Sequence, residues 1–197
     1  MRALILNYGV GNLFSISSAL RRAGFDVEVN ENLIGNYDLV VFPGVGTFKA
    51  VINYLRSKLE VINELRNSST YFLGICIGMH VMFEYGFEGG INEGLKWLNG
   101  YVDRIRAADV KLPHIGWDKV YVLSNNELTE VLDDEYVYFM HSYIAYTDEP
   151  VAVFSYYGIK FPVTIIKDNL IAVQFHPERS GRVGIKFLTR LYRWLRR

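Results

Sequence analysis

A cysteine flanked by glycines is the residue in this sequence that most clearly indicates chemistry. Cys76 stands two residues after Gly74 and two before Gly78, where a short apolar run (71–75) meets a helix-like run. A nucleophile in this context sits on a tight strand-to-helix turn, the nucleophile elbow, where side chains at both flanking positions would collide. The pattern predicts a nucleophilic Cys76, with its thiolate favoured by the start of the helix and an oxyanion met by the N–H of Ile77. The alternative is a small buried hydrophobic residue, a common role for a free cysteine.

A cysteine nucleophile needs a base, and His176 is the best placed of the four histidines. It closely follows the apolar run 170–174, and Glu178 stands two residues later. In extended backbone, residues i and i+2 project to the same side, so the Glu178 carboxylate can fix the tautomer and orientation of the imidazole. Sites in parallel sheets form at the carboxyl ends of strands, and both Cys76 and His176 follow strand-like runs. We therefore predict a triad of Cys76, His176 and Glu178.

The other three histidines are weaker candidates for the base. His80 stands four residues after Cys76 on the same helical face, but no carboxylate orients it, so we expect it in the lining of the pocket. His114 and His141 have no acidic neighbour at a useful spacing, and a core or pocket-wall role is the default for both. The sequence has no cysteine pair, no His-x-x-x-His and no dense carboxylate cluster, so neither a metal nor another cofactor is expected.

Two glycine-rich loops follow apolar runs. Residues 9–12 (Gly-Val-Gly-Asn) match the start of a dinucleotide-binding turn, but the third glycine of that pattern is missing. If this loop bound a phosphate and Cys76 were inert, the protein would be a flavodoxin-like binding module, the non-enzyme alternative. Residues 43–46 (Pro-Gly-Val-Gly) follow the run 39–42. Their N–H groups can approach a ligand closely, so Gly44 and Val45 are candidates for a second oxyanion donor, with an ordinary turn as the alternative.

The elements that must position these residues alternate in the first half of the chain. Apolar runs at 3–6, 26–29, 39–42 and 71–75 alternate with helical periodicity from 13 to 24 and from 47 to 65. The second half predicts strands at 101–105, 119–123, 136–140, 151–157, 161–166 and 170–175, and then an amphipathic helix from 183. This order predicts one α/β domain over residues 1–197, with a doubly wound, largely parallel central sheet, helices on both faces and additional antiparallel strands.

Composition argues against several other classes of protein. The chain has 197 residues, 50% of them hydrophobic, and its 21 basic and 21 acidic side chains give zero net charge. Nucleic-acid binding, which a basic excess favours, is therefore not expected. The longest mostly apolar stretch, 71–83, is shorter than the roughly 20 residues that span a bilayer, and no secretory leader is recognisable. A single cysteine allows no disulfide within the chain, and we expect a soluble, cytoplasmic protein without membrane partners.

Five segments together resemble the class I (triad) glutamine amidotransferases. Within that class they are similar to the glutaminase subunits of imidazole glycerol phosphate synthase, an enzyme of histidine biosynthesis. The resemblance covers essentially the whole chain, and the elements Gly-x-Cys-x-Gly and His-Pro-Glu are shared by the whole class. The segments are Pro-Gly-Val-Gly-x-Phe at 43–48, Gly-x-Cys-x-Gly-Met at 74–79, Pro-His-x-Gly-Trp at 113–117, His-Ser-Tyr at 141–143 and Gln-Phe-His-Pro-Glu at 174–178.

The resemblance implies a reaction and a site. Cys76 would attack the side-chain amide of L-glutamine, releasing ammonia and leaving a glutamyl thioester. His176 would protonate the departing ammonia and then activate water, with Glu178 holding the imidazole. The resemblance also implies oxyanion donors at Gly44, Val45 and Ile77, and substrate-binding residues at His80, His141, Ser142 and Tyr143.

The family further implies a partner, a separate (β/α)8 cyclase subunit that forms a heterodimer with this chain and uses the ammonia. Asn12 and Trp117 resemble residues at that interface. One departure is His80, which stands where the family usually has glutamine; imidazole can still donate or accept a hydrogen bond, but its reach differs. A glutaminase subunit of another amidotransferase and a stand-alone cysteine hydrolase on the same scaffold are the enzyme alternatives.

Overall fold

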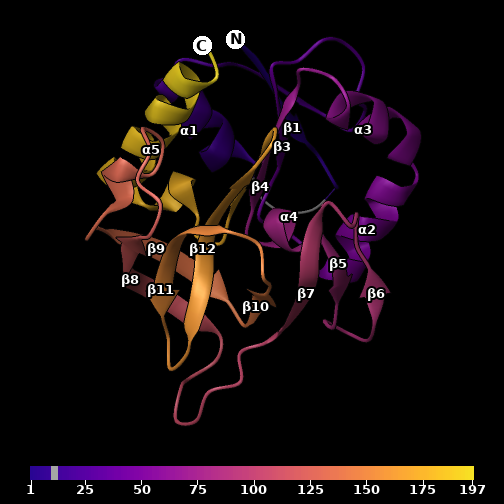
Figure 1. Cartoon of the computed structure of the whole chain (residues 1–197). Helices are drawn as coiled ribbons and strands as arrows, with labels where there is room; N and C mark the ends of the chain where they lie inside the picture. The colour runs from indigo at the N-terminus through magenta and orange to yellow at the C-terminus, as the bar shows by residue number, and fades with distance from the viewer. Residues whose placement is uncertain (10–12) are drawn as a thin grey trace.

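A nine-stranded sheet forms the centre of the molecule, whose computed structural model describes residues 1–9 and 13–197. The strand order is β2-β1-β3-β4-β13-β12-β11-β8-β9 (Figure 1). Five strands pair in parallel: β2 (Asp26–Asn30), β1 (Arg2–Leu6), β3 (Leu39–Phe42), β4 (Tyr71–Ile75) and β13 (Leu170–Val173). The other four continue the sheet in antiparallel fashion: β12 (Lys160–Lys167), β11 (Val151–Tyr156), β8 (His114–Val122) and β9 (Tyr136–His141). Strand β13 therefore joins the parallel half of the sheet to the antiparallel half.

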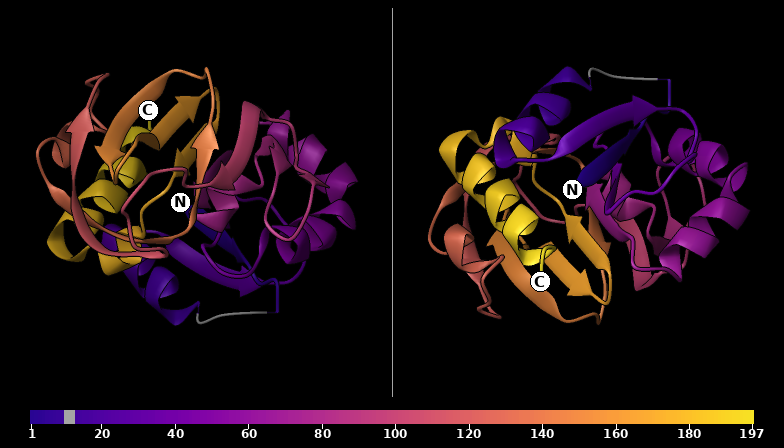
Figure 2. Two further views of the ribbon diagram at one scale, coloured as in Figure 1. Left: turned by 90° about the horizontal axis from the view of Figure 1, so that it is seen from below. Right: turned by 90° about the horizontal axis from the view of Figure 1, so that it is seen from above.

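Helices cover both faces of this sheet (Figures 1 and 2). Both faces of the sheet need such cover because both are apolar. Along β1, Ala3 and Ile5 pack into one apolar core, while Leu4 and Leu6 pack into the other. Helices α1 (Phe14–Ala23) and α5 (Gly181–Trp194) pack together over the first core. Helices α2 (Phe48–Arg56) and α3 (Leu59–Arg66) cover the second. The predicted doubly wound α/β fold with added antiparallel strands is confirmed.

The structure also contains a second, smaller sheet, which the sequence did not predict. Its order is β10-β7-β5-β6, formed by β5 (Phe83–Gly86), β6 (Asn92–Glu93), β7 (Leu98–Arg104) and β10 (Tyr143–Tyr146). Only β7 overlaps a predicted strand. Gly86 lets this sheet approach α2 closely, since a Cβ atom there would lie 2.3 Å from the ring of Phe48.

The helical period from 47 to 65 does not form one helix. Thr47 caps α2, its hydroxyl accepting from the N–H of Ala50 at 3.4 Å. The Ser57 hydroxyl donates to the carbonyl of Tyr54 at 2.7 Å, and Lys58 has a φ of −129°, outside the helical region, so a separate α3 begins at Leu59. Three short helical turns complete the fold: α4 (Ile77–His80), η1 (Glu130–Leu132) and η2 (Pro177–Arg179). None of the helices in the described part of the chain is long and apolar enough to cross a membrane.

Candidate active site

Cys76 lies on a strained turn between β4 and α4. Its φ of 49° and ψ of −108° fall in a region that residues with a side chain rarely adopt. The flanking glycines allow the turn, because a Cβ atom on Gly74 would lie 2.6 Å from the carbonyl oxygen of Gly78. A Cβ atom on Gly78 would lie 2.0 Å from the carbonyl oxygen of Phe42. The steric reason for the glycine spacing is thus confirmed.

The neighbouring strand brings His176 to the same edge of the sheet. Strand β13 pairs in parallel with β4, with Val173 opposite Ile75, so the residues that follow the two strands leave the sheet side by side. The His176 N–H donates to the carbonyl of Tyr138 at 2.9 Å, and the Ser180 hydroxyl donates to the carbonyl of His176 at 2.7 Å. These two bonds fix the backbone that carries the imidazole.

Glu178 holds the His176 ring, although not by the route that the sequence indicated. The Nδ1 atom of His176 lies 2.8 Å from Oε1 of Glu178. The extended i, i+2 geometry was wrong, because Glu178 lies in the 3₁₀ turn η2, which begins at Pro177 directly after the extended His176. The turn brings the carboxylate back onto the imidazole, so the pairing forms from a different local conformation.

Gly44 is where the glycine loop, the base and the nucleophile meet. A Cβ atom on Gly44 would lie 2.7 Å from Cε1 of His176 and 3.2 Å from Cβ of Cys76. Only a residue without a side chain leaves room for both groups. Within the same loop, Gly46 has a φ of 98°, which favours glycine. The loop of residues 43–46 therefore lies directly against Cys76 and His176.

Among the four histidines, His176 alone has a raised pKa, whereas the pKa values of the other three are lowered. Burial lowers the pKa of His176, but the Cys76 sulfur and the Glu178 carboxylate outweigh burial and raise the pKa to about 10. Burial lowers the pKa of His80 to about 4 despite its bond to Gln174. Burial also lowers the pKa values of His141 and His114, in His114 against the opposing effect of Asp118. At neutral pH, His176 is therefore an imidazolium beside Cys76, while the other three histidines are neutral.

The expectation that a helix dipole acts on Cys76 is only weakly met. Helix α4 has only four residues, so few peptide dipoles align behind the sulfur. Two polar groups from other parts of the chain lie near Sγ. Sγ lies 3.6 Å from the amide nitrogen of Gln174 and 3.8 Å from the carbonyl oxygen of Met140. Sγ is therefore contacted by the backbone of β9 and by the residue that directly follows β13.

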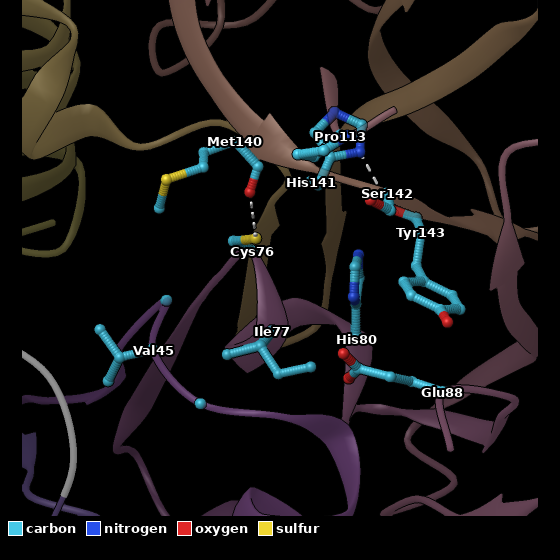
Figure 3. Close-up of a pocket in the computed structure, with 12 residues that line it drawn as sticks. Val45, Cys76, Ile77, His80, Glu88, Pro113, Met140, His141, Ser142 and Tyr143 are labelled. Atoms are coloured by element: carbon cyan, nitrogen blue, oxygen red, sulfur yellow. Dashed lines mark hydrogen bonds between the residues drawn. The ribbon is translucent and has the colours of Figure 1, made fainter. Parts of the chain in front are cut away.

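A pocket of about 470 Å³ opens onto Cys76 (Figure 3). All the predicted oxyanion and substrate-binding residues line it, whereas the buried His176 and the half-buried Glu178 are not among its lining residues. Sequence reasoning missed three of its lining residues, Glu88, Pro113 and Met140, and also Gln174. Pro113 and Gln174 had a sequence signal, their places in the segments 113–117 and 174–178. The full lining is Gly44, Val45, Gly46, Cys76, Ile77, His80, Glu88, Pro113, Met140, His141, Ser142 and Tyr143.

A chain of hydrogen bonds links the pocket to strand β8. The Nδ1 atom of His141 lies 3.0 Å from the carbonyl oxygen of Tyr143, and its Nε2 lies 3.2 Å from Nδ1 of His114. The Nε2 atom of His114 lies 2.7 Å from Oδ2 of Asp118. The sequence-based view that His114 lacks an acidic partner was wrong, because residues four apart on a strand share one face. This network fixes the segment 141–143 in the wall of the pocket.

Trp117 lies on an exposed apolar surface next to the site. Its side chain is 50% exposed. On the paired strands β8 and β9, Trp117 lies opposite Tyr138, and the exposed Ile115 lies opposite the exposed Met140. This surface of Ile115, Trp117 and Met140, the β8–β9 face, forms part of one edge of the central sheet. Asn12, the other predicted interface residue, lies outside the described residues.

No group of three or more histidine, cysteine, aspartate or glutamate side chains within residues 1–9 and 13–197 is arranged to hold a metal ion.

The fold and this cysteine–histidine–glutamate arrangement define a class of enzyme. Residues 4–191 match the family model "Glutamine amidotransferase class-I", and the chain belongs to this family. Within the family it groups with the HisH subunits. It is 55% identical to "Imidazole glycerol phosphate synthase subunit HisH" of Sulfolobus acidocaldarius and 50% identical to that of Saccharolobus solfataricus, each over 100% of both chains.

Solved structures of lower identity share the fold. PurLQS from Thermotoga maritima superposes with a TM-score of 0.72 at 18% identity, covering 98% of each chain. A glutamine amidotransferase from the same organism superposes with a TM-score of 0.66 at 18% identity, covering 100% of this chain and 84% of that one. The architecture that positions the site is therefore found at identities far below those of the HisH relatives.

Proposed function

We propose that this chain is the glutaminase subunit of an imidazole glycerol phosphate synthase. It hydrolyses L-glutamine to glutamate and ammonia and delivers the ammonia to a (β/α)8 cyclase subunit for histidine biosynthesis. The observation that carries the proposal is Cys76 on a strained elbow beside a charged His176, in a chain similar over its whole length to HisH subunits. We further propose that residues 1–197 act as one domain. Because its single cysteine must stay reduced to react, we assign the reaction to the cytoplasm.

The geometry supports a two-stage mechanism. The Cys76 thiolate attacks the side-chain carbonyl carbon of glutamine, and the N–H groups of Ile77 and of the Gly44–Val45 segment stabilise the oxyanion. The His176 imidazolium gives its proton to the leaving nitrogen, so the C–N bond breaks and ammonia departs from a glutamyl thioester. The neutral imidazole then takes a proton from water, which attacks the thioester, and glutamate leaves as the sulfur regains its charge.

The pocket has the polar groups that an amino-acid substrate requires. The Glu88 carboxylate lines it and also accepts the N–H of Phe48 at 2.7 Å, which fixes its position. Such a carboxylate can accept from the α-ammonium group of glutamine. Ser142 and Tyr143 add hydroxyl groups to the lining of the pocket (Figure 3). We propose that these residues, with His80 and His141, select glutamine.

The β8–β9 face supports a partner close to the chemistry. Ile115, Trp117 and Met140 expose apolar area there, and exposed apolar patches mark interaction surfaces. The carbonyl of Met140 lies 3.8 Å from Sγ of Cys76, so the strand that carries part of this surface also borders the nucleophile. We propose that the cyclase subunit docks over this face, as the word "subunit" in the names of the relatives indicates.

Glutamate production, measured for the chain alone, with the cyclase subunit, and with cyclase and its nucleotide substrate, tests the proposal. Glycines on both sides of Val45 allow the loop to turn its peptides, so the oxyanion donor need not be aligned in the free chain. We expect the liganded complex to work about a hundred- to a thousandfold faster than the free chain, the effect of one oxyanion donor.

Each alternative predicts a different result in this assay. A free chain that turns over glutamine as fast as the liganded complex would indicate a stand-alone hydrolase. Failure to bind the cyclase, with turnover induced by another acceptor enzyme, would indicate a different amidotransferase. A chain whose Cys76 does not react with a glutamine-analogue electrophile would support the binding module.

A further inference from the structure

A buried glutamine connects the nucleophile to His80. Gln174 directly follows β13 and is fully buried, and its backbone N–H donates to the carbonyl of Val163 at 2.9 Å. Its side-chain oxygen lies 2.7 Å from Nε2 of His80, and its side-chain nitrogen lies 3.6 Å from Sγ of Cys76. One amide group therefore contacts both side chains, away from solvent.

The charge on the sulfur determines which end of the amide faces it. When His176 is an imidazolium and Cys76 a thiolate, the sulfur can only accept hydrogen bonds. The amide NH₂ group of Gln174 satisfies it, which leaves the amide oxygen facing His80. That oxygen can only accept, so the Nε2 atom of His80 must carry a hydrogen. Because burial lowers the pKa of His80 to about 4, the neutral ring has a single N–H, and Gln174 fixes it on Nε2.

The opposite orientation of the amide is unfavourable at both ends. It would point the carbonyl oxygen at the thiolate, and it would place the amide NH₂ against the Nε2–H of His80. Both contacts are electrostatically repulsive, and neither side chain can turn to water, because Gln174 is 0% and His80 3% exposed. The imidazole can relieve the second clash only by moving its hydrogen to Nδ1.

We propose that Gln174 is a further catalytic residue, whose amide N–H stabilises the Cys76 thiolate, and that His80 is a positioning residue, which holds this amide in the donating orientation. The proposal rests on the proposed function, in which Cys76 reacts as a thiolate. It also assigns a role to the histidine that stands where the related subunits usually have glutamine. A glutamine side chain at this position would likewise offer an N–H to the amide oxygen of Gln174.

The pH dependence of Cys76 alkylation by iodoacetamide, measured on the intact chain, tests this role. Cys76 is the single cysteine, so the rate reports its thiolate alone. Gln174→Leu, and the similarly shaped Gln174→Met, should raise the midpoint of the pH profile by about one to two units, the effect of one hydrogen bond to a charged group. His80→Leu should raise it by less, and His80→Gln should restore the wild-type midpoint.

Thr164→Val provides a matched control. Thr164 is buried on β12 opposite Val173, next to the strand that leads to Gln174, and its hydroxyl has no hydrogen-bond partner among the described residues. Removing this hydroxyl should leave the midpoint unchanged. Circular dichroism and urea unfolding identify which variants are folded.

Two results would overturn the proposal. If folded Gln174→Leu and Gln174→Met keep the wild-type midpoint, Gln174 does not stabilise the thiolate. If His80→Leu has no effect while Gln174→Leu does, His80 has no positioning role. Alkylation needs no glutamine, so a Gln174-dependent midpoint in a chain that never releases glutamate would refute the proposed function and not the role of Gln174.

Discussion

A Cβ atom on Gly44 would lie 2.7 Å from Cε1 of His176, nearer than real Cβ contacts allow. The loop that we assign to the oxyanion and the imidazole that we assign to proton transfer therefore share one space. Neither can shift far without moving the other. The two functions most sensitive to geometry are thus coupled by contact.

Gly44→Ala should impair catalysis more than stability. The new methyl group meets the ring of His176 and forces it from its position, and we expect glutaminase activity to fall by about a hundredfold as the base is displaced. Gly78→Ala is the contrast, because its methyl group would lie 2.0 Å from a backbone oxygen and should destabilise the fold. Activity and urea unfolding of both variants check this. A fully active Gly44→Ala would show that the contact has no functional role.

Cys76→Ala should abolish glutamine hydrolysis while ammonia-dependent synthesis by the complex persists. The cyclase needs only ammonia, whereas the glutaminase step needs a sulfur nucleophile, and its loss should lower the rate about a thousandfold or more. Parallel assays with glutamine and with ammonium salts measure the two activities. Substantial glutamine-driven turnover in the variant complex would reject Cys76 as the nucleophile.

His176→Ala should cost far more activity than His80→Gln. His176 bonds to Glu178 and carries the proton, so its removal should lower glutaminase activity by about a hundred- to ten-thousandfold. His80→Gln keeps a hydrogen-bond donor at Gln174 and should stay within about tenfold of the wild type. Steady-state glutaminase kinetics of the two variants, each in complex with the cyclase subunit, measure the difference. Equal losses of activity in the two variants would mean that His176 is not the base.

His80 should make folding stability depend on acid pH. Its pKa is about 4 in the folded chain against 6.5 for an ordinary histidine, so below pH 6.5 the unfolded state binds a proton that the folded state does not. This contribution is present above pH 6.5 and is lost as the pH falls toward 4. Relative to His80→Gln, the wild type should lose about 3 kcal/mol between pH 7 and pH 4. Urea unfolding at both values measures it, and a constant difference would refute the assignment.

Trp117→Ala should weaken binding of the cyclase subunit by about tenfold or more, because half-buried aromatic anchors dominate interfaces. Isothermal titration calorimetry measures the affinity. Ile34→Ala is the control, since Ile34 is 74% exposed but lies between β2 and β3, toward the other edge of the sheet. Equal effects of the two variants would show that the β8–β9 face is not the docking surface.

The sequence predicted the parts of the site that depend on local pattern. The glycine spacing around Cys76 and the strand-like runs before Cys76 and His176 follow from steric rules within a few residues. Short strands such as β6, with two residues, have too little period to detect. The break at Lys58 escaped notice because neither glycine nor proline marks it.

Residues that reach the pocket through tertiary contacts could not be found from the sequence. Glu88 comes from the connection between β5 and β6, and its place in the wall depends on the second sheet packing over α2. The contact of Gln174 with His80 joins residues 94 positions apart in the chain. No periodicity or spacing in the sequence predicts such a pair. The two residues meet because β13 lies next to β4 in the sheet.

The central position of β4 and β13 in the sheet has an evolutionary consequence. These strands deliver Cys76 and His176 from the most enclosed part of the fold, whereas β8 and β9 present Trp117 at an edge. The contacts from β9 to Cys76 and to His176 are made by the backbone carbonyls of Met140 and Tyr138, so substitutions of exposed side chains on the edge strands can accumulate without removing them. Mutations confined to the exposed surface of β8 and β9 can therefore change which acceptor enzyme the chain binds. The ammonia-releasing chemistry at Cys76 and His176 need not change with the partner.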